Sequence, residues 1–256
     1  MPSKAPRRSD RLWQGRTRGA LLAMSLWLIG ASPGTAADFI TEARFTEPTT
    51  RYPHGVLGDS IEYGALELTV KSADAERRRR TVMIRLPEDR VFEDLSPRLV
   101  DIDSDSTPEV VVVESQDQLG AQLAIYNARG EKIAATPHIG TRFRWLAPIG
   151  AADLDGDGYV EIAYIDRPHL AKTLRIWRFK DDDLTEIATL SGLTNHRIGE
   201  DFITGGVRDC GNGPELIVAS ADWQQIVSAH YDHNWKTQEL AAFTQAAMKQ
   251  TLICAQ

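Results

Sequence analysis

Residues 149–164 decide the fold, and they read IGAADLDGDGYVEIAY. Two short apolar segments enclose an acidic loop that carries Asp at 153, 155 and 157 and ends on Glu161. Gly158 permits the positive φ that a tight loop of this kind requires. Because apolar runs of this length with turn residues between them are typical of strands, the stretch predicts two strands joined by an acidic loop.

The same arrangement recurs along the chain with a period of about fifty residues. Residues 98–113 read RLVDIDSDSTPEVVVV, and Asp101 precedes its counterpart Asp153 by 52 residues. A degenerate copy passes through Asp209, and its Glu215 follows Glu161 by 54 residues. Two more strand-like segments follow each loop, so each unit holds four short strands. The segment before Leu99 also has the strand pattern of a unit, although its loop lacks the alternating Asp residues.

Repeats of this length with four strands each predict an all-β fold, a small β-propeller of about four four-stranded blades. A stack of hairpins or an open sandwich could use the same strands. The expected organisation is a signal peptide at 1–37 and a propeller domain at 38–256, with repeat units at about 55–97, 98–147, 148–201 and 202–240 and a C-terminal tail at 241–256.

The acidic loops have the oxygen spacing of a Ca²⁺ site, since this ion prefers six to eight oxygen ligands in loose geometry. An EF-hand is excluded, because Tyr164 stands where its bidentate acid belongs and strands flank the loop. An acidic turn that holds no ion remains the alternative. The expected ligands are Asp153, Asp155, Asp157, Tyr159 and Glu161 in one loop and Asp101, Asp103, Asp105, Thr107 and Glu109 in the other, with Tyr159 and Thr107 offering their carbonyls.

These loops resemble those of FG-GAP repeats, which also occur in VCBS-type repeat proteins and in the propeller of integrin α-subunits. The resemblance implies a Ca²⁺ loop between the first two strands of a blade, which is where Asp153 to Glu161 falls. The Asp101 loop departs from the pattern by having Ser106 at the glycine position. The Asp209 loop has Gly211 and Asn212 in place of carboxylates, so no metal is expected there.

The N-terminus has the order of a secretory signal peptide: a basic segment, an apolar run at 20–29, then Pro33-Gly34 and small residues up to Ala37. The apolar run is short for a membrane span, although a retained anchor is the alternative. Its six Lys/Arg and one Asp leave 38–256 with a net charge of −12, against −7 for the whole chain. We therefore expect a periplasmic or secreted protein that does not bind nucleic acid and has no membrane span after the leader is removed.

The chain has two cysteines, Cys210 and Cys254. In an oxidising compartment an even pair favours a disulfide, which would fasten the C-terminal tail to the fourth repeat.

The sequence favours a binding or structural module for an unknown periplasmic protein or envelope component over an enzyme. It lacks a nucleophile elbow, a phosphate-binding glycine loop and a Cys-x-x-Cys motif. The alternative function is a hydrolase on a propeller scaffold, with a general acid–base pair near His54 and Asp59. A deep funnel lined by His54, Asp59 or His196 would favour that alternative.

Overall fold

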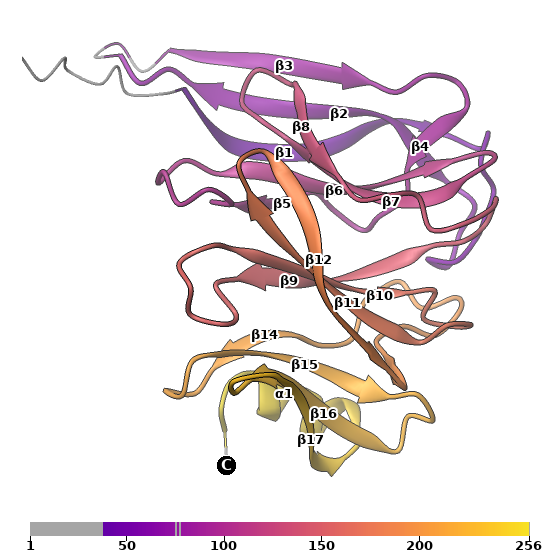
Figure 1. Ribbon diagram of the computed structural model, residues 1–256. Coiled ribbons are helices and arrows are strands. Elements are labelled where there is room, and N and C mark those ends of the chain that lie inside the picture. Colours follow the sequence, from indigo (N-terminus) through magenta and orange to yellow (C-terminus); the bar gives the residue numbers. More distant parts are fainter. Residues whose placement is uncertain (1–37, 75, 77, 256) are drawn as a thin grey trace, which may run out of the picture. The chain divides into compact units, whose positions relative to one another are not determined.

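A computed structural model describes residues 38–256 except 75, 77 and 256. Over these residues the chain is almost entirely β, with antiparallel strands gathered into sheets and one short helix near the C-terminus (Figure 1). The all-β class predicted from the repeats is confirmed. The predicted signal peptide at 1–37 lies outside the described residues.

In the described part of the chain, the first unit contains β1 (Phe39–Thr49), β2 (Glu62–Lys71) and β3 (Arg79–Arg85), with β2 between the other two. Strand β1 lies before residue 55, where the sequence repeat was expected to begin. One face of this unit is polar, and ion pairs join Arg44 to Glu67 at 2.6 Å and Arg85 to Glu47 at 2.7 Å.

The second unit is a four-stranded blade whose first strand is broken in two. Strands β4 (Arg90–Phe92) and β5 (Arg98–Val100) pair with opposite halves of β6 (Glu109–Gln116), which is followed by β7 (Gly120–Tyr126) and β8 (Lys132–Ala135). Strand β4 falls within the expected first repeat unit, yet it pairs with β6 along its whole length and with β2 only through Phe92 and Tyr63. This shared strand joins the first two units into one sheet.

The third and fourth units repeat the four-stranded arrangement. The third runs β9 (Leu146–Ala152), β10 (Glu161–Asp166), β11 (Thr173–Lys180) and β12 (Asp183–Ser191). The fourth again has a broken first strand, β13 (Leu193–Thr194) with β14 (Gly206–Asp209), followed by β15 (Pro214–Ser220), β16 (Gln225–Tyr231) and β17 (Trp235–Ala242). Strand β13 falls within the expected third repeat unit but pairs with the fourth.

The central strands bury both faces, which explains their nearly unbroken apolar sequences. In β10, Ile162 and Tyr164 face the second unit, whereas Ala163 and Ile165 face the fourth. In β6 the same alternation of period two sends odd-numbered valines toward the third unit and even-numbered valines toward the first. The units therefore pack face to face in chain order, each pair around its own apolar core.

The last unit ends on a helix, which the sequence analysis did not anticipate. Helix α1 (Gln245–Leu252) begins after Thr244, whose side chain accepts a hydrogen bond from the Ala247 N–H at 2.9 Å. Its buried Met248 packs with Ile217 and Ile226, whereas the alternate residues Leu216 and Val218 face the third unit. Among the described residues, no helix is long and apolar enough to cross a membrane.

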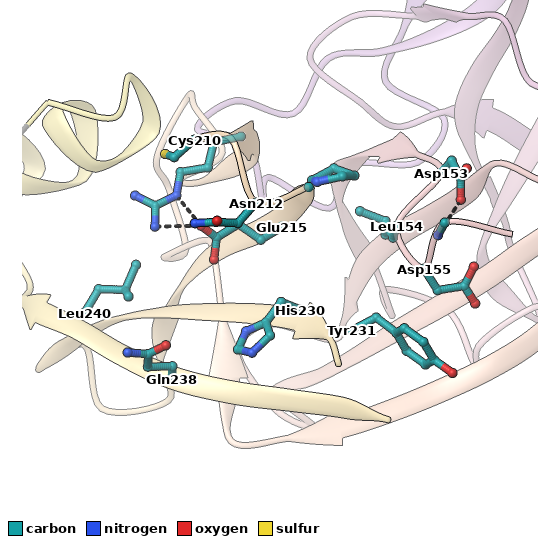
Figure 2. A pocket seen from close by; sticks show the side chains of 14 residues that line it. Asp153, Leu154, Asp155, Cys210, Asn212, Glu215, His230, Tyr231, Gln238 and Leu240 are labelled. Atoms are coloured by element: carbon teal, nitrogen blue, oxygen red, sulfur yellow. Dashed lines mark hydrogen bonds and ion pairs between the residues drawn. The ribbon is translucent and has the colours of Figure 1, made fainter. Parts of the chain in front are cut away.

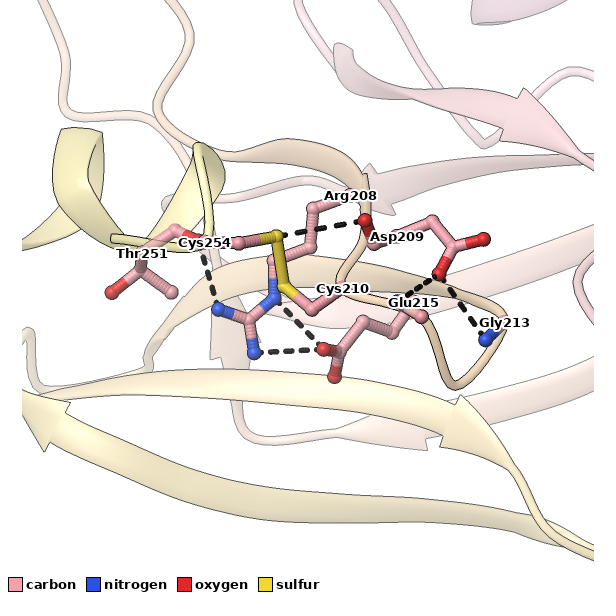
Figure 3. The surroundings of a disulfide bond; sticks show 8 residues. Arg208, Asp209, Cys210, Gly213, Glu215, Thr251 and Cys254 are labelled. Atoms are coloured by element: carbon pink, nitrogen blue, oxygen red, sulfur yellow. Dashed lines mark hydrogen bonds and ion pairs between the residues drawn. A yellow bond between two sulfur atoms is a disulfide. The ribbon is translucent and has the colours of Figure 1, made fainter. Parts of the chain in front are cut away.

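The tail that follows the helix is held by the disulfide that the sequence predicts. Cys210 and Cys254 are bonded, with their Cα atoms 5.7 Å apart (Figure 3). Arg208 reinforces this attachment by donating from Nη1 to the Thr251 carbonyl at 2.8 Å. The bond therefore links the β14–β15 loop to the end of α1.

Replacing both cysteines, Cys210→Ser with Cys254→Ser, is expected to lower the free energy of unfolding by up to about 4 kcal/mol, because the bond closes a segment of 44 residues. Urea unfolding monitored by circular dichroism measures the change. Reduction of the wild-type protein should reproduce it, and equal stability of the oxidised wild type and the double variant would contradict the prediction.

Candidate functional site

The Asp101 loop, residues 101–108 between β5 and β6, gathers its carboxylates around one point. Oxygen atoms of Asp101, Asp103 and Glu109 all lie within 4.8 Å of one another. Backbone donors fix two of these side chains: the Ser106 N–H donates to Asp101 Oδ2 at 3.1 Å and the Ile102 N–H to Glu109 Oε2 at 3.2 Å. The loop therefore presents a group of negatively charged oxygens whose positions the backbone sets.

The backbone of this loop adopts the conformation that glycines allow in its counterpart. Gly156 and Gly158 of the Asp153 loop have φ of 78° and 90°. The equivalent Ser104 and Ser106 also have positive φ, at 62° and 73°. A left-handed conformation at a non-glycine residue is unfavourable and persists only where its surroundings impose it. The glycine-to-serine change at 106 therefore leaves the shape of the loop intact.

Glu109 places a buried carboxyl group next to this loop. Its side chain is largely buried at the start of β6, and burial, with the nearby Asp103 and Asp105 carboxylates adding to it, raises the pKa of Glu109 to about 7. Among the described residues, no Lys or Arg forms an ion pair with any of the four carboxylates of this loop. Burial without a counter-charge disfavours the ionised form of this carboxyl group, and a bound cation would offset that cost.

The Asp153 loop, residues 153–160 between β9 and β10, repeats these backbone contacts. The Leu154 N–H donates to Glu161 Oε2 at 2.8 Å, and the Gly158 N–H donates to Asp153 Oδ2 at 3.0 Å. Oxygen atoms of Asp153, Asp155 and Glu161 again lie within 4.8 Å of one another. Here, however, the Arg178 guanidinium forms ion pairs with three carboxylates of the loop.

The Asp209 loop, where no metal was expected, also receives a guanidinium. Arg208 donates from Nε to Glu215 Oε1 at 2.8 Å and from Nη2 to the same oxygen at 2.7 Å (Figure 3). The Asp209 carboxylate accepts from the Gly211 and Gly213 N–H groups. Here an arginine neutralises the glutamate that the other two loops also place at the start of the second strand.

The structure brings three of the expected ligand side chains of each loop close together. Asp105 and Asp157 lie outside the two close groups, and each accepts a hydrogen bond from the backbone N–H two residues later, at Thr107 and Tyr159. Arg178 was not among the site residues predicted from the sequence. Alignment of the two repeats could have pointed to it, because Arg178 follows Trp177 at the place where the other repeat has Asn127 after Tyr126.

A cavity of about 510 Å³ lies between the Asp153 loop and the fourth unit (Figure 2). Asp153 and Asp155 line one side of it, and the β14–β15 loop and strands β16 and β17 line the rest. Tyr231, at the end of β16, is 40% exposed and contributes an aromatic ring to the lining. The cavity thus combines charged, hydrogen-bonding and aromatic groups next to an acidic loop.

The structure does not pair His54 with Asp59, as the alternative hydrolase site required. His54 Nδ1 lies 2.5 Å from Oε1 of the buried Glu93, whereas the Asp59 carboxylate accepts from the Ile61 N–H at 2.8 Å. His54 thus contacts Glu93, which is 39 residues away in the sequence, and the fold rather than the local motif provides this partner. His54 lines a cavity of about 220 Å³ whose lining includes His169 but neither Asp59 nor His196.

Comparison with known proteins supports the repeat. Residues 101–164, which hold both acidic loops, match the family of FG-GAP-like repeats. No curated protein matches the chain. A crystal structure of a protein from Lactobacillus plantarum is similar with a TM-score of 0.37 and 11% identity, over 71% of this chain and 54% of that one. The chain thus spans about half the length of that protein.

The buried Glu62 leads to a prediction about pH. It is 2% exposed, and burial, followed by the charges of Glu93, Asp59 and Asp94, raises its pKa to about 9. The unfolded chain releases this proton near pH 4.3, so the folded state loses relative stability as the pH rises from there to about 9. Glu62→Gln, which is neutral at every pH, should therefore stabilise the protein by up to about 4 kcal/mol at pH 7 and by almost nothing at pH 4.

Urea unfolding of both proteins between pH 4 and pH 8 measures this difference. Glu42→Gln, at an exposed position on β1, is the matched control and should have no such effect. A constant difference between Glu62→Gln and the wild type across this range would contradict the prediction.

Proposed function

We propose that the chain is an exported propeller-type module that binds Ca²⁺ through the Asp101 loop and a protein or envelope partner beside the Asp153 loop. The observation that carries the calcium assignment is the buried Glu109, which sits with Asp101 and Asp103 in a close group of oxygens and has no Lys or Arg partner among the described residues. A divalent cation with oxygen preference would supply the missing charge.

The donor set fits Ca²⁺ better than the alternatives. It consists of carboxylates on a loop, with no imidazole or thiolate among the grouped side chains, which disfavours Zn²⁺ and other softer metals. When bound, the ion would supply positive charge that holds β5 and β6 together at the loop. In this proposal its role is structural, because the match to FG-GAP-like repeats indicates a binding or structural module.

The cavity beside the Asp153 loop is the surface that we assign to the partner. Its volume of about 510 Å³ and its lining of Asp155, Arg208, His230 and Tyr231 offer charge of both signs and an exposed aromatic ring. Such a combination is typical of protein-binding surfaces, in which tyrosine and arginine are enriched. No nucleic acid is expected as partner, since residues 38–256 carry a net charge of −12.

Calcium should stabilise the folded protein. A ligand that binds only the folded state at a hundred times its Kd adds about 2.7 kcal/mol, which for a chain of this size raises the Tm by about 5–10 °C. Asp103→Asn should abolish most of the rise, and Asp182→Asn, in the exposed β11–β12 turn, should leave it unchanged. Differential scanning fluorimetry with Ca²⁺ and with chelator measures the shift, and identical melting in the two buffers would refute the calcium site.

Export and partner binding can be tested together by purifying the chain from a periplasmic extract. Its mass should correspond to an N-terminus at Ala37 or Asp38, with the leader removed. A co-purifying component should be retained by the wild type and lost from Tyr231→Ala, with the exposed Ile253→Ala as control. A full-length chain in the membrane fraction would disprove the export proposal, and equal retention by the two variants would disprove the assigned surface.

A further inference from the structure

Arg178, on strand β11, forms ion pairs with the Asp153 loop. It is the cross-strand partner of Glu161 in the β10–β11 pair, so the register of the sheet directs its side chain to the loop. Its Nε donates to Glu161 Oε1 at 2.7 Å and its Nη1 lies 2.9 Å from Asp157 Oδ2, while Nη2 pairs with Asp155. Three of the expected calcium ligands therefore share one guanidinium.

Among the residues that the structure describes, no cation takes the equivalent place at the Asp101 loop. Val110 pairs with Tyr126 in the second unit as Ile162 pairs with Trp177 in the third, so Asn127 occupies the position of Arg178. The Asn127 amide is engaged in its own turn, where Nδ2 donates to Glu131 Oε2 at 3.0 Å and Oδ1 accepts from the Arg129 N–H. The two loops share their backbone contacts and differ in the charge that faces them.

The residues of the Asp153 loop, as the structure arranges them, do not fit a calcium ion. Ca²⁺ needs six to eight oxygens, and the three that pair with Arg178 are among those the loop would have to supply. Arginine remains protonated at every pH that a folded protein tolerates, so the guanidinium cannot leave by losing its charge. Binding a metal here requires the arginine to be moved away from its partners.

We infer that Arg178 is an intramolecular counter-ion that closes the Asp153 loop to calcium, so that the loop with the better sequence match is the weaker metal site. The inference concerns a second loop of the proposed calcium-binding module, and in that respect it rests on the proposed function. It assigns to Arg178 the structural role that an ion would have in the Asp101 loop. Arg208 does the same for Glu215 in the fourth unit.

The test is the number of calcium ions bound per chain, measured by isothermal titration calorimetry on the wild type and on Arg178→Gln. The wild type should bind one ion and Arg178→Gln two, the second within about tenfold of the first in affinity. Adding Asp153→Asn to Arg178→Gln should remove the second ion, which locates it. Arg178→Lys keeps a cation at the loop and should keep the count at one.

Arg175→Gln is the matched control, because Arg175 lies on the same strand and also pairs with two carboxylates, Asp166 and Glu186, away from the loop. Both glutamine variants should be less stable than the wild type in chelator. Calcium should restore the stability of Arg178→Gln but not that of Arg175→Gln. If Arg178→Gln does not fold in chelator, its refolding on addition of calcium is the readout.

The possible results separate this inference from the proposed function. Two ions on both wild type and Arg178→Gln, or one on both, would overturn the role of Arg178 and leave calcium binding in place. No ion on the wild type and one on Arg178→Gln would overturn the Asp101 site and support the inference. No ion on either protein would refute both.

Discussion

The glutamate at the start of the second strand of a unit is the constraint on which the loop region depends. Glu109 and Glu161 each stand at the first position of a central strand, largely or fully buried, and each accepts a hydrogen bond from a backbone N–H of the preceding loop. A carboxyl group in such a place either stays protonated or is stabilised by a positive partner, because burial of an unpaired charge is costly. The glutamate recurs along the chain, and the units differ in the positive partner that it has: Arg178 faces Glu161, and Arg208 faces Glu215.

The remainder of the structure follows from sheets that must cover each other. A central strand that is apolar on both faces is stable only between two neighbours, so β6 and β10 each contribute alternate side chains to two cores. The outer faces of the first and last units, which in the described part of the chain have a neighbouring unit on one side only, are covered in different ways. The first unit has a charged outer face, with pairs such as Arg44–Glu67, and the last unit is covered by α1 through Met248.

The sequence was sufficient to predict the all-β repeat, both acidic loops and the disulfide, because each depends on local pattern or on cysteine count. It was insufficient for features that depend on contacts between segments far apart in the sequence. Strand β1 has a mixed composition and acquires its role only by pairing with β2, and α1 is recognisable only because Met248 finds an apolar face. Arg178 reads as an ordinary surface residue until the register places it opposite Glu161.

Strand β1 has a consequence for behaviour at high concentration. It pairs with β2 on one side only, so its other backbone edge is unpaired among the described strands and could template the addition of a strand from another molecule. Three features oppose this: a bulge between Ile40 and Glu42, the exposed charges of Glu42 and Arg44, and Pro48 near the end of the strand. Proline has no N–H to donate to an incoming strand, and charged side chains along an edge disfavour pairing with a strand of another molecule. Among the described residues, these three features, and no further strand, limit pairing at an edge of eleven residues.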